Sequence, residues 1–312
     1  MNKNKCGVDV SKEWLDARIE PVGVVGRFPN NAAGIAELVA LCRAHDVELV
    51  IMEASGGYER LPFLLLWEAG MACAIANARS VRRFAEGLGI LEKTDKIDAG
   101  VIAYYGEVKR LKPTPPPSAA QQRLKALVTR LSQVTGDLTI QKQRRKATAE
   151  AEIIASLDQV IALLKRQERQ LEGEIASLID DDPLWAHLDK AFRSLKGVAS
   201  RTVARLMAEV PEIGTLSNKA VAKLVGLAPI ANDSGKRVGR RPVRGGRAGP
   251  RSILFLVARM VAKHDPHLGA FHQRLKAAGK EKMVIRIALA RKLLVILNAK
   301  ARDARIEFAN AT

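Results

Sequence analysis

Four acidic residues in the first third of the sequence could together bind metal ions. Asp95 and Asp98 lie three positions apart in KTDKIDAGVIA, where a helix would bring their Cβ atoms within about 5–6 Å. Asp9 lies inside the apolar segment CGVDV, and Glu53 ends the apolar run VELVIME. Four converging carboxylates repel one another unless a cation compensates them. Mg²⁺ or Mn²⁺ prefers such oxygen ligands, and two ions about 3.5–4 Å apart can promote phosphodiester chemistry.

Three of these residues also have a simpler interpretation. Asp95 alone suits the positive N-terminal end of a helix. Glu53 could be an ordinary residue at the end of a strand, and Asp9 could accept a hydrogen bond in a turn. As a set, in the order Asp, Glu, Asp-x-x-Asp on two strands and one helix, they favour a shared metal site.

The elements that must position these residues predict a mixed α/β sheet. Residues 5–19 have the pattern of a hairpin, with a turn at residues 11–13. A further short strand, and then helices alternating with apolar strands, complete the pattern of an α/β domain. Glu53 lies at the carboxyl end of a predicted parallel strand, where open α/β sheets bind ligands. We therefore predict an α/β catalytic domain over residues 1–112.

A proline-rich segment, KPTPPPS, separates this domain from the rest of the chain. Residues 113–185 then have apolar positions at helical spacing, which predicts two long helices. These helices could form a simple spacer hairpin or a coiled coil that joins two chains, and the pattern favours neither. Residues 186–312 are predicted to be mainly helical, with one long loop rich in glycine and arginine.

The net charge of +18 is concentrated at the C-terminal end. Residues 191–312 contain 25 Lys or Arg and 7 Asp or Glu, whereas residues 1–110 contain 14 and 15. Such a segmental excess predicts a polyanionic partner, and nucleic acid fits better than an anionic membrane. The basic segments lack the bulky aromatic face of membrane-adsorbing helices, and no apolar run reaches the roughly 18 residues of a transmembrane helix. We expect no membrane partner.

Cysteine usage and the N-terminal segment predict a cytoplasmic protein. Cys6, Cys42 and Cys73 lie in apolar segments and form neither a C-x-x-C pattern nor a disulfide framework. The N-terminal residues lead directly into a predicted strand and lack the apolar core of a signal peptide.

The glycine- and arginine-rich loop contains a candidate nucleophile. In GLAPIANDSGKRVGRR, Ser234 precedes a glycine and a cluster of basic residues. A serine hydroxyl needs a proton acceptor and suitable charges to attack phosphorus, and arginines can stabilise the negative charge that develops. Composition alone favours a plain turn in a phosphate-binding loop. The residues predicted here to contact nucleic acid are Lys236, Arg237, Arg240, Arg241, Arg244, Arg247 and Arg251.

A second candidate contact lies at Lys196 and Gly197, in the segment SLKGVAS. Backbone N–H groups in a turn before a helix can hold a DNA phosphate without reading its sequence. An ordinary glycine-containing turn between two helices explains the same residues equally well.

Three segments, GVDVSKEWLDARI, MEASGGYERL and KTDKIDAGVIA, resemble the N-terminal domain of the DEDD transposases of the IS110 family, relatives of the Piv invertases. The resemblance extends over nearly the whole chain. It implies a ribonuclease-H-like fold shared with Holliday-junction resolvases, and it assigns the metal-binding tetrad to Asp9, Glu53, Asp95 and Asp98. It also implies a C-terminal transposase domain in which Ser234 attacks DNA and forms a phosphoserine link.

Further expectations follow from this resemblance. Members of the IS110 group are guided by a structured noncoding RNA that pairs with donor and target DNA, so RNA is an implied partner beside DNA. A bacterial, nucleoid-associated protein is also implied. The long helical spacer suggests a dimer or tetramer in which the serine of one subunit serves the tetrad of another.

Two other functions remain as alternatives. A non-catalytic nucleic-acid-binding protein would explain the charge but leaves the four carboxylates without a role. An actin-like or sugar-kinase-like ATPase also begins with an Asp-bearing hairpin, but its further phosphate and adenosine loops are not found in the sequence.

Overall fold

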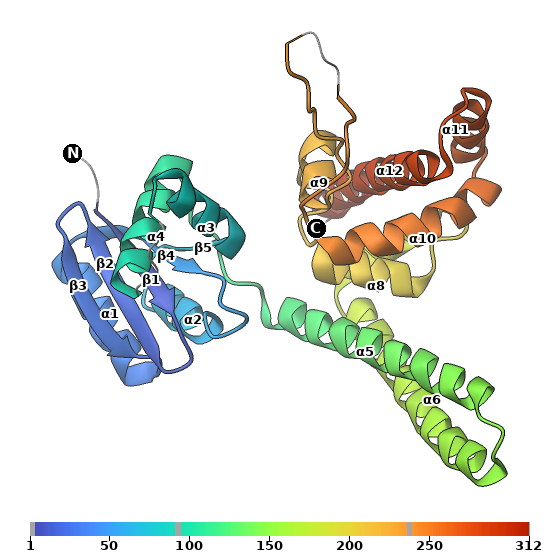
Figure 1. Cartoon of the computed structure of the whole chain (residues 1–312), viewed down its shortest axis with the longest axis horizontal. Coiled ribbons are helices and arrows are strands. Elements are labelled where there is room, and N and C mark those ends of the chain that lie inside the picture. The colour runs from blue at the N-terminus through green and yellow to red at the C-terminus, as the bar shows by residue number, and fades with distance from the viewer. Residues whose placement is uncertain (1–3, 91–94, 236–238, 312) are drawn as a thin grey trace. The chain divides into compact units, whose positions relative to one another are not determined.

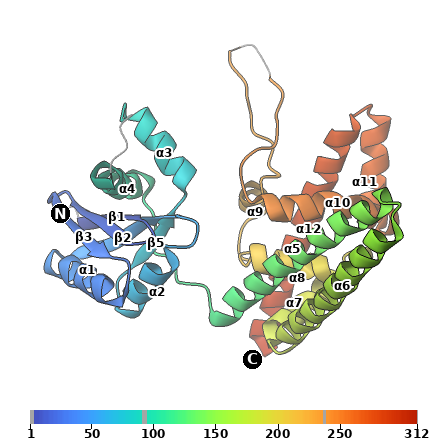
Figure 2. The ribbon, with the colours of Figure 1, turned by 60° about the horizontal axis from the view of Figure 1, so that its bottom comes forward.

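The computed structural model describes residues 4–90, 95–235 and 239–311, with only the backbone of residues 95–97. The chain divides into two compact units, Met1–Pro117 and Ser118–Thr312, which Figures 1 and 2 show from two directions. Each unit has its own hydrophobic core, so each is described by itself. No helix in the described ranges is long and apolar enough to cross a membrane.

The first unit contains a five-stranded sheet with helices on both faces (Figure 1). Its strands are β1 (Asn4–Val10), β2 (Trp14–Glu20), β3 (Val24–Pro29), β4 (Val47–Glu53) and β5 (Cys73–Ala76). Its helices are α1 (Ala32–Ala44), α2 (Arg60–Glu68), α3 (Ala78–Gly87) and α4 (Asp95–Lys109).

Alternation along the strands separates two cores. Val8 and Val10 of β1 lie in one core with residues of α1 and α2, whereas Ile51 of β4 lies in the other with Ile102 of α4. Successive strand residues point to opposite faces, so odd positions of β1 and β4 point toward α3 and α4. Asn31 caps α1, and its Oδ1 accepts a hydrogen bond from the Gly34 N–H at 3.0 Å.

The strand order is β3-β2-β1-β4-β5. β1, β2 and β3 are antiparallel neighbours, whereas β4 is parallel to both β1 and β5. This arrangement confirms the mixed α/β sheet and the hairpin predicted at its start. The register between β1 and β4 is well defined, because each central residue is buried on one face or the other.

The second unit is helical throughout its regular structure. Its helices in the described residues are α5 (Ala119–Ala147), α6 (Ala151–Asp180), α7 (Pro183–Arg193), α8 (Ser200–Glu209), α9 (Asn218–Leu224), α10 (Ala248–His264), α11 (Pro266–Ala277) and α12 (Lys282–Ala311). The connection from α9 to α10 is the glycine- and arginine-rich loop, which projects away from the helices in both ribbon views (Figures 1 and 2).

α5 and α6 pack along each other as a hairpin within one chain (Figure 2). Val134 and Leu138 of α5 meet Ile161 and Leu164 of α6 in a small core of their own. The other half of the hairpin belongs to the main core of the second unit, through residues such as Leu124. A coiled coil between chains, and the division of this region at residue 185, remain predictions.

α12 is the central helix of the second unit, and a buried amide fixes its neighbours. Asn298 is fully buried; its Oδ1 accepts from the Gly214 N–H at 2.9 Å, and its Nδ2 donates to the Leu216 carbonyl at 3.0 Å. Because an unpaired amide at this depth would be costly, these bonds hold the turn that leads into α9 and the basic loop.

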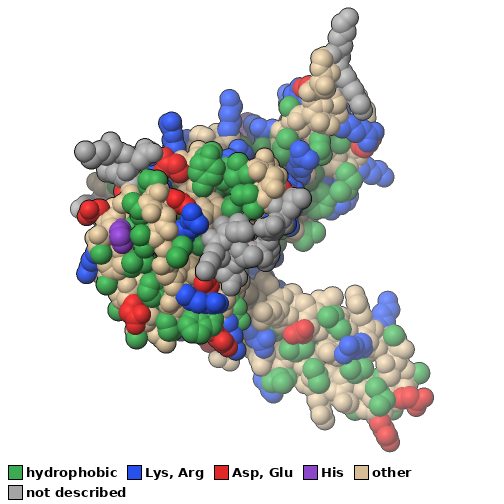
Figure 3. Space-filling view, turned by 60° about the vertical axis from the view of Figure 1, so that its left-hand side comes forward, with side chains coloured by type: hydrophobic (Ala, Val, Ile, Leu, Met, Phe, Trp, Pro, Cys, Tyr) green, Lys and Arg blue, Asp and Glu red, His purple; other side chains and the backbone are tan. Residues whose placement is uncertain are grey.

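The surface and the cysteines of the first unit agree with the sequence. Acidic and basic side chains are interspersed over the face seen in Figure 3, as expected for a segment with balanced charge. All three cysteines are buried free thiols. Burial raises the pKa of the Cys73 thiol to about 12, so this sulfur stays protonated and unreactive.

Candidate active site

The sheet register brings Asp9 and Glu53 to the same edge. β1 and β4 are parallel, and Val8 pairs with Met52, so Asp9 and Glu53 come next at the carboxyl ends of adjacent strands. Val8 and Met52 are buried on the α1–α2 face. Asp9 and Glu53 therefore lie on the opposite face, which α4 covers.

Gly7 allows α4 to pass directly over β1. A Cβ atom at Gly7 would lie 2.0 Å from the Ala99 carbonyl oxygen and 2.5 Å from the Ala103 nitrogen, so only glycine permits this approach. At the other end of β1, Lys5 forms an ion pair with Glu107. Since residue 107 lies over the start of β1 and residue 99 over its middle, α4 runs antiparallel to β1.

This orientation places the first turn of α4 over the carboxyl edge of β1 and β4. Asp98 immediately precedes Ala99, and Asp95 begins the helix. The four predicted ligand positions thus lie at one edge and on one face of the sheet. Asp9, Glu53 and Asp98 are each partly buried, while the side chain of Asp95 lies outside the described residues.

The donor set fits a hard divalent cation. All four residues supply carboxylate oxygens, which Mg²⁺ and Mn²⁺ prefer to nitrogen or sulfur. Among the side chains that the structure describes, no three Asp, Glu, His or Cys residues lie close enough to hold one ion. Asp9, Glu53 and Asp98 therefore do not form such a group by themselves, and a site shared with Asp95 stays a prediction.

Asp16 is an acidic neighbour that the sequence patterns did not reveal. It is opposite Asp9 in the antiparallel pair of β1 and β2, so both side chains lie on the α4 face. Asp16 is only 8% exposed, and Arg27 lies with its Nε 3.5 Å from the Asp16 Oδ1. The pairing of the predicted hairpin could have placed Asp16 opposite Asp9, but that pairing depends on the exact length of the turn between the two strands.

The loop after Glu53 is fixed by Glu59. The Glu59 Oε2 accepts hydrogen bonds from the Gly57 N–H at 2.8 Å, the Ser55 N–H at 3.1 Å and the Ser55 hydroxyl at 3.0 Å. Burial by itself raises the pKa of Glu59, but these hydrogen bonds outweigh it and the pKa lies below its usual value. The chain leaving the carboxyl edge of β4 is therefore held in one conformation.

The candidate nucleophile lies on an exposed loop in the second unit. The two arms of this serine loop, residues 226–247, meet where Pro229 bridges to Val243 and the Ile230 N–H donates to the Pro242 carbonyl at 3.0 Å. Ser234 is exposed beyond this point. Lys236 and Arg237, predicted to contact nucleic acid, lie outside the described residues.

Asp233 ties the two arms together beside Ser234. Its Oδ1 accepts from the Gly239 N–H at 3.1 Å, and its Oδ2 accepts from Arg241 at 2.8 Å. Asp233 lies in the segment for which composition alone favoured a plain turn. The contact to Gly239, six residues away, makes it a structural support of the serine loop.

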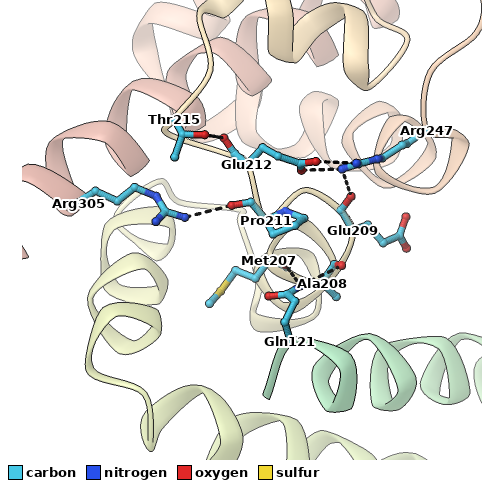
Figure 4. A network of polar contacts seen from close by, with 9 residues as sticks. All are labelled: Gln121, Met207, Ala208, Glu209, Pro211, Glu212, Thr215, Arg247 and Arg305. Carbon is cyan, nitrogen blue, oxygen red and sulfur yellow. Dashed lines mark hydrogen bonds and ion pairs between the residues drawn. The ribbon is translucent and has the colours of Figure 1, made fainter. Parts of the chain in front are cut away.

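The base of the serine loop is anchored by Arg247, as Figure 4 shows. Its guanidinium donates to both Glu212 carboxylate oxygens, at 2.6 and 2.7 Å, and to the Glu209 carbonyl at 2.8 Å. Burial by itself raises the pKa of Glu212, but the bonds from Arg247 outweigh it and the pKa is lowered. A bidentate pair of this kind fixes geometry as well as charge.

Apart from Arg241, which pairs with Asp233, the described basic residues predicted to contact nucleic acid in this loop divide into two groups. Arg247 and Arg251 hold the fold, since Arg251 donates to the Gly245 carbonyl at 2.7 Å. Arg240 and Arg244 are exposed, and neither forms an ion pair with another described residue. The exposed pair is better placed to meet a phosphate.

Lys196 and Gly197 form the turn between α7 and α8. Gly197 has φ +98°, and a Cβ there would lie 3.2 Å from the Val261 Cα, so glycine is needed for both the turn and the close approach to α10. Lys196 is exposed in this turn, and α8 begins without a side-chain cap. The geometry is compatible with a phosphate contact and equally with a packing turn.

Comparisons with known proteins match both halves of the chain. Residues 6–152 match a family model described as Transposase, and residues 189–273 match one described as Transposase IS116/IS110/IS902 family. The chain belongs to the IS110 family of transposases. This membership makes it a DNA transposase or site-specific recombinase by class. The first match spans the four predicted ligand positions, and the second spans the whole serine loop.

Curated relatives support the same IS110 assignment over the full length. The chain is 29% identical to a pilin gene-inverting protein of Moraxella bovis and 28% identical to that of Moraxella lacunata, each over 98% of both chains. Two solved structures of RuvC, one titled Thermus thermophilus RuvC and one titled T. thermophilus RuvC in complex with Holliday junction substrate, match 36% of this chain. The match to the RuvC structure without a substrate in its title covers 99% of that chain, at 15% identity and a TM-score of 0.26. The match to the complex covers 100% of the RuvC chain, at 14% identity and a TM-score of 0.27.

Proposed function

We propose that this transposase cuts and rejoins DNA with a metal site at Asp9, Glu53, Asp95 and Asp98 and with Ser234 as nucleophile. The observation that supports it best is the close crossing of α4 over Gly7. That crossing supports the proposal because the first turn of α4 begins over the edge where Asp9 and Glu53 end their strands. If these acids served only to form ion pairs within the fold, four of them would not be needed at this edge.

Each group has a defined part in the reaction. The Ser234 Oγ attacks phosphorus, its proton passes to an acceptor, and the bond from phosphorus to the leaving deoxyribose oxygen breaks. A hydroxyl of the second strand then attacks the phosphoserine, and the serine oxygen leaves. Bound Mg²⁺ or Mn²⁺ would supply charge stabilisation for these displacements. Arg240 and Arg244 hold the phosphates, and Asp233 orients the serine loop.

Two further features belong to this proposal. The serine of one subunit serves the acidic site of another within a homo-oligomer, and a noncoding RNA guides the choice of DNA. The excess of basic residues after position 190 supports a nucleic-acid surface, which suits duplex DNA and folded RNA alike. Sequencing the nucleic acid that copurifies with the protein from its host tests guidance, because a single discrete RNA is expected.

The central experiment is a strand-exchange assay in Mg²⁺ with two variants and two controls. We expect Asp98→Asn and Ser234→Ala each to lower the rate by a factor on the order of 10³ or more, as for groups that act as one catalytic unit. Asp46→Asn and Ser252→Ala change exposed residues of the same types and should retain activity. All four proteins should bind DNA.

A denaturing gel then separates the roles. A covalent protein–DNA adduct should form with the unmodified protein and be absent with Ser234→Ala. Mixing Ser234→Ala with Asp98→Asn should restore exchange if sites are shared between subunits. Full activity of Ser234→Ala, or of Asp98→Asn, would overturn the proposal.

A further inference from the structure

A cavity of about 520 Å³ lies directly beneath the serine loop. One wall is formed by Pro229 and Val243, the two residues that bridge the arms of the loop. The other walls come from Phe271 of α11 and from Val284 and Ala288 of α12. The volume is within the range of pockets that hold small organic ligands.

The lining of this cavity combines apolar side chains with a basic rim. Arg241, Arg291 and Lys292 stand among the lining residues, and none of the described lining residues is acidic. Met283 and Val284 are 59% and 50% exposed, so apolar surface is offered to an occupant and not closed within the core. Such a site suits a flat, largely apolar ring that carries an anionic group beside it.

A nucleotide has this chemistry, because its base is an apolar-faced ring and its phosphate is an anion. An aliphatic peptide segment would fill the walls but would bring no negative charge to Arg291 and Lys292. The position of the cavity also favours a nucleotide, since Arg241 belongs both to its lining and to the ion pair with Asp233 beside Ser234. A group that enters here lies next to the strand held by the serine loop.

We propose that this cavity, termed the base pocket, receives one unstacked nucleobase of the DNA strand on which Ser234 acts. The proposal rests on the function proposed above for the serine loop. The ring of Phe271 and the apolar side chains of α12 replace the stacking that the base loses in the duplex. Arg291 and Lys292 contact the adjoining phosphates.

An occupied base pocket would also position the scissile phosphate. The bridge between Pro229 and Val243 is where the two arms of the serine loop come together. A nucleobase packed against these two residues therefore fixes the DNA strand relative to Ser234. Extruding a base is easiest where pairing is already broken. The base pocket therefore acts on strands that are open or being exchanged.

The test uses the full-length chain carrying Ser234→Ala, so that binding is measured without cleavage. The probes are a single-stranded thymidine oligonucleotide and an abasic oligonucleotide of equal length and charge. We expect the thymidine strand to bind about tenfold more tightly, the gain expected from stacking one base. Phosphate contacts are the same for both probes, so the ratio isolates the base.

Two substitutions close the base pocket in different ways. Ala288→Phe fills it, and Val284→Glu brings a negative charge to an exposed position at its wall. Both substitutions should reduce the ratio of thymidine-strand affinity to abasic-strand affinity to about one. For Ala288→Phe, the affinity for the abasic strand should change little. The matched controls are Ala309→Phe, exposed farther along α12, and Val160→Glu, exposed on α6. Both controls should keep the tenfold ratio.

Several results would overturn the base pocket. They are an equal affinity of the two probes for the starting protein, a ratio that survives both closing substitutions, or a base preference for uridine RNA with none for DNA. A change of oligomeric mass with Val284→Glu and no change in the ratio would assign the cavity to a second copy of the chain. If Ser234→Ala abolishes strand exchange but the two probes bind with equal affinity, the proposed function stands and only the base-pocket proposal is wrong.

Discussion

The acidic edge of the first unit and the serine loop of the second are built in opposite ways. At the acidic edge, two strands and one helix fix the carboxylates, and backbone atoms of α4 and β1 are too close for any side chain at Gly7. The serine loop is an exposed extension that leaves the helical core at residue 226 and returns at residue 247. Its conformation depends on a few polar contacts, mainly those of Asp233 and Arg247.

This difference suggests a division of labour. A metal site needs several ligands held to within a fraction of an ångström, which rigid elements provide. In the proposed function Ser234 becomes covalently joined to DNA and must move with it, which a loop permits. The acidic edge should therefore be sensitive to packing changes, and the serine loop to the loss of single polar contacts.

The largest effect is expected at Gly7. Gly7→Ala places a methyl group 2.0 Å from the Ala99 carbonyl, so α4 must shift away from β1 and carry Asp98 with it. Overpacking against backbone should cost about 3 kcal/mol, and a displacement near 1 Å should slow strand exchange about 100-fold. Thermal unfolding and the exchange rate measure the two effects.

The control for this variant is Gly87→Ala, at the end of α3. Apart from its chain neighbours and the backbone of its own helix, no described atom lies within 4 Å of a Cβ built there. The change should therefore leave the rate unaltered and stability equal or slightly higher. If Gly7→Ala were as stable and active as this control, α4 would not depend on the close crossing that positions Asp98.

A smaller effect is expected at the base of the serine loop. Arg247→Met removes the bidentate pair and leaves Glu212, partly buried, without its partner. We expect a loss of about 1–2 kcal/mol, limited by solvent screening because both side chains are more than one-third exposed. Urea unfolding of the second unit measures it, and the double variant with Glu212→Gln should recover part of the loss.

The pH dependence of this pair has a definite sign. The pKa of Glu212 is lowered in the folded protein, so its contribution is complete above the unfolded pKa of a glutamate. The contribution disappears as pH falls through the folded pKa. The stability difference between the starting protein and Arg247→Met should therefore be constant near neutral pH and shrink in acid; a difference that grows in acid would contradict the assignment.

The acidic edge shows what sequence periodicity can supply. Asp9 and Glu53 could each be assigned to a strand because apolar residues surround Asp9 and a continuous apolar run ends at Glu53, whereas the parallel pairing of the two strands came from the structure. The i, i+3 spacing of Asp95 and Asp98 likewise follows from helical geometry. Asp16 escaped notice because its position opposite Asp9 depends on the pairing of two strands, and a turn longer by one residue would have turned it to the other face.

The serine loop shows where such inference ends. Composition suggested that seven basic residues between positions 236 and 251 clamp phosphate, yet Arg247 is bonded to Glu212, 35 residues earlier. Arg251 is bonded to backbone carbonyls. No local spacing encodes those partners, because they are set by how α8, α9 and α10 pack. The count of basic residues pointed to this loop as a phosphate-binding surface, but it did not show which of its arginines are already bonded within the fold.

The smallest change in stability and the most specific change in activity are expected at Asp233. Asp233→Asn weakens an exposed ion pair with Arg241, which should alter unfolding by less than about 0.5 kcal/mol. The serine loop would sample more conformations around Ser234, and we expect exchange at saturating DNA to slow about tenfold. Asp303→Asn, an exposed acid on α12, is the matched control and should change neither quantity. Because Gly7→Ala lowers stability and rate together, a separate fall in rate at Asp233 would distinguish a loop held by single contacts from an edge held by packing. An unchanged rate would mean that DNA alone shapes the loop.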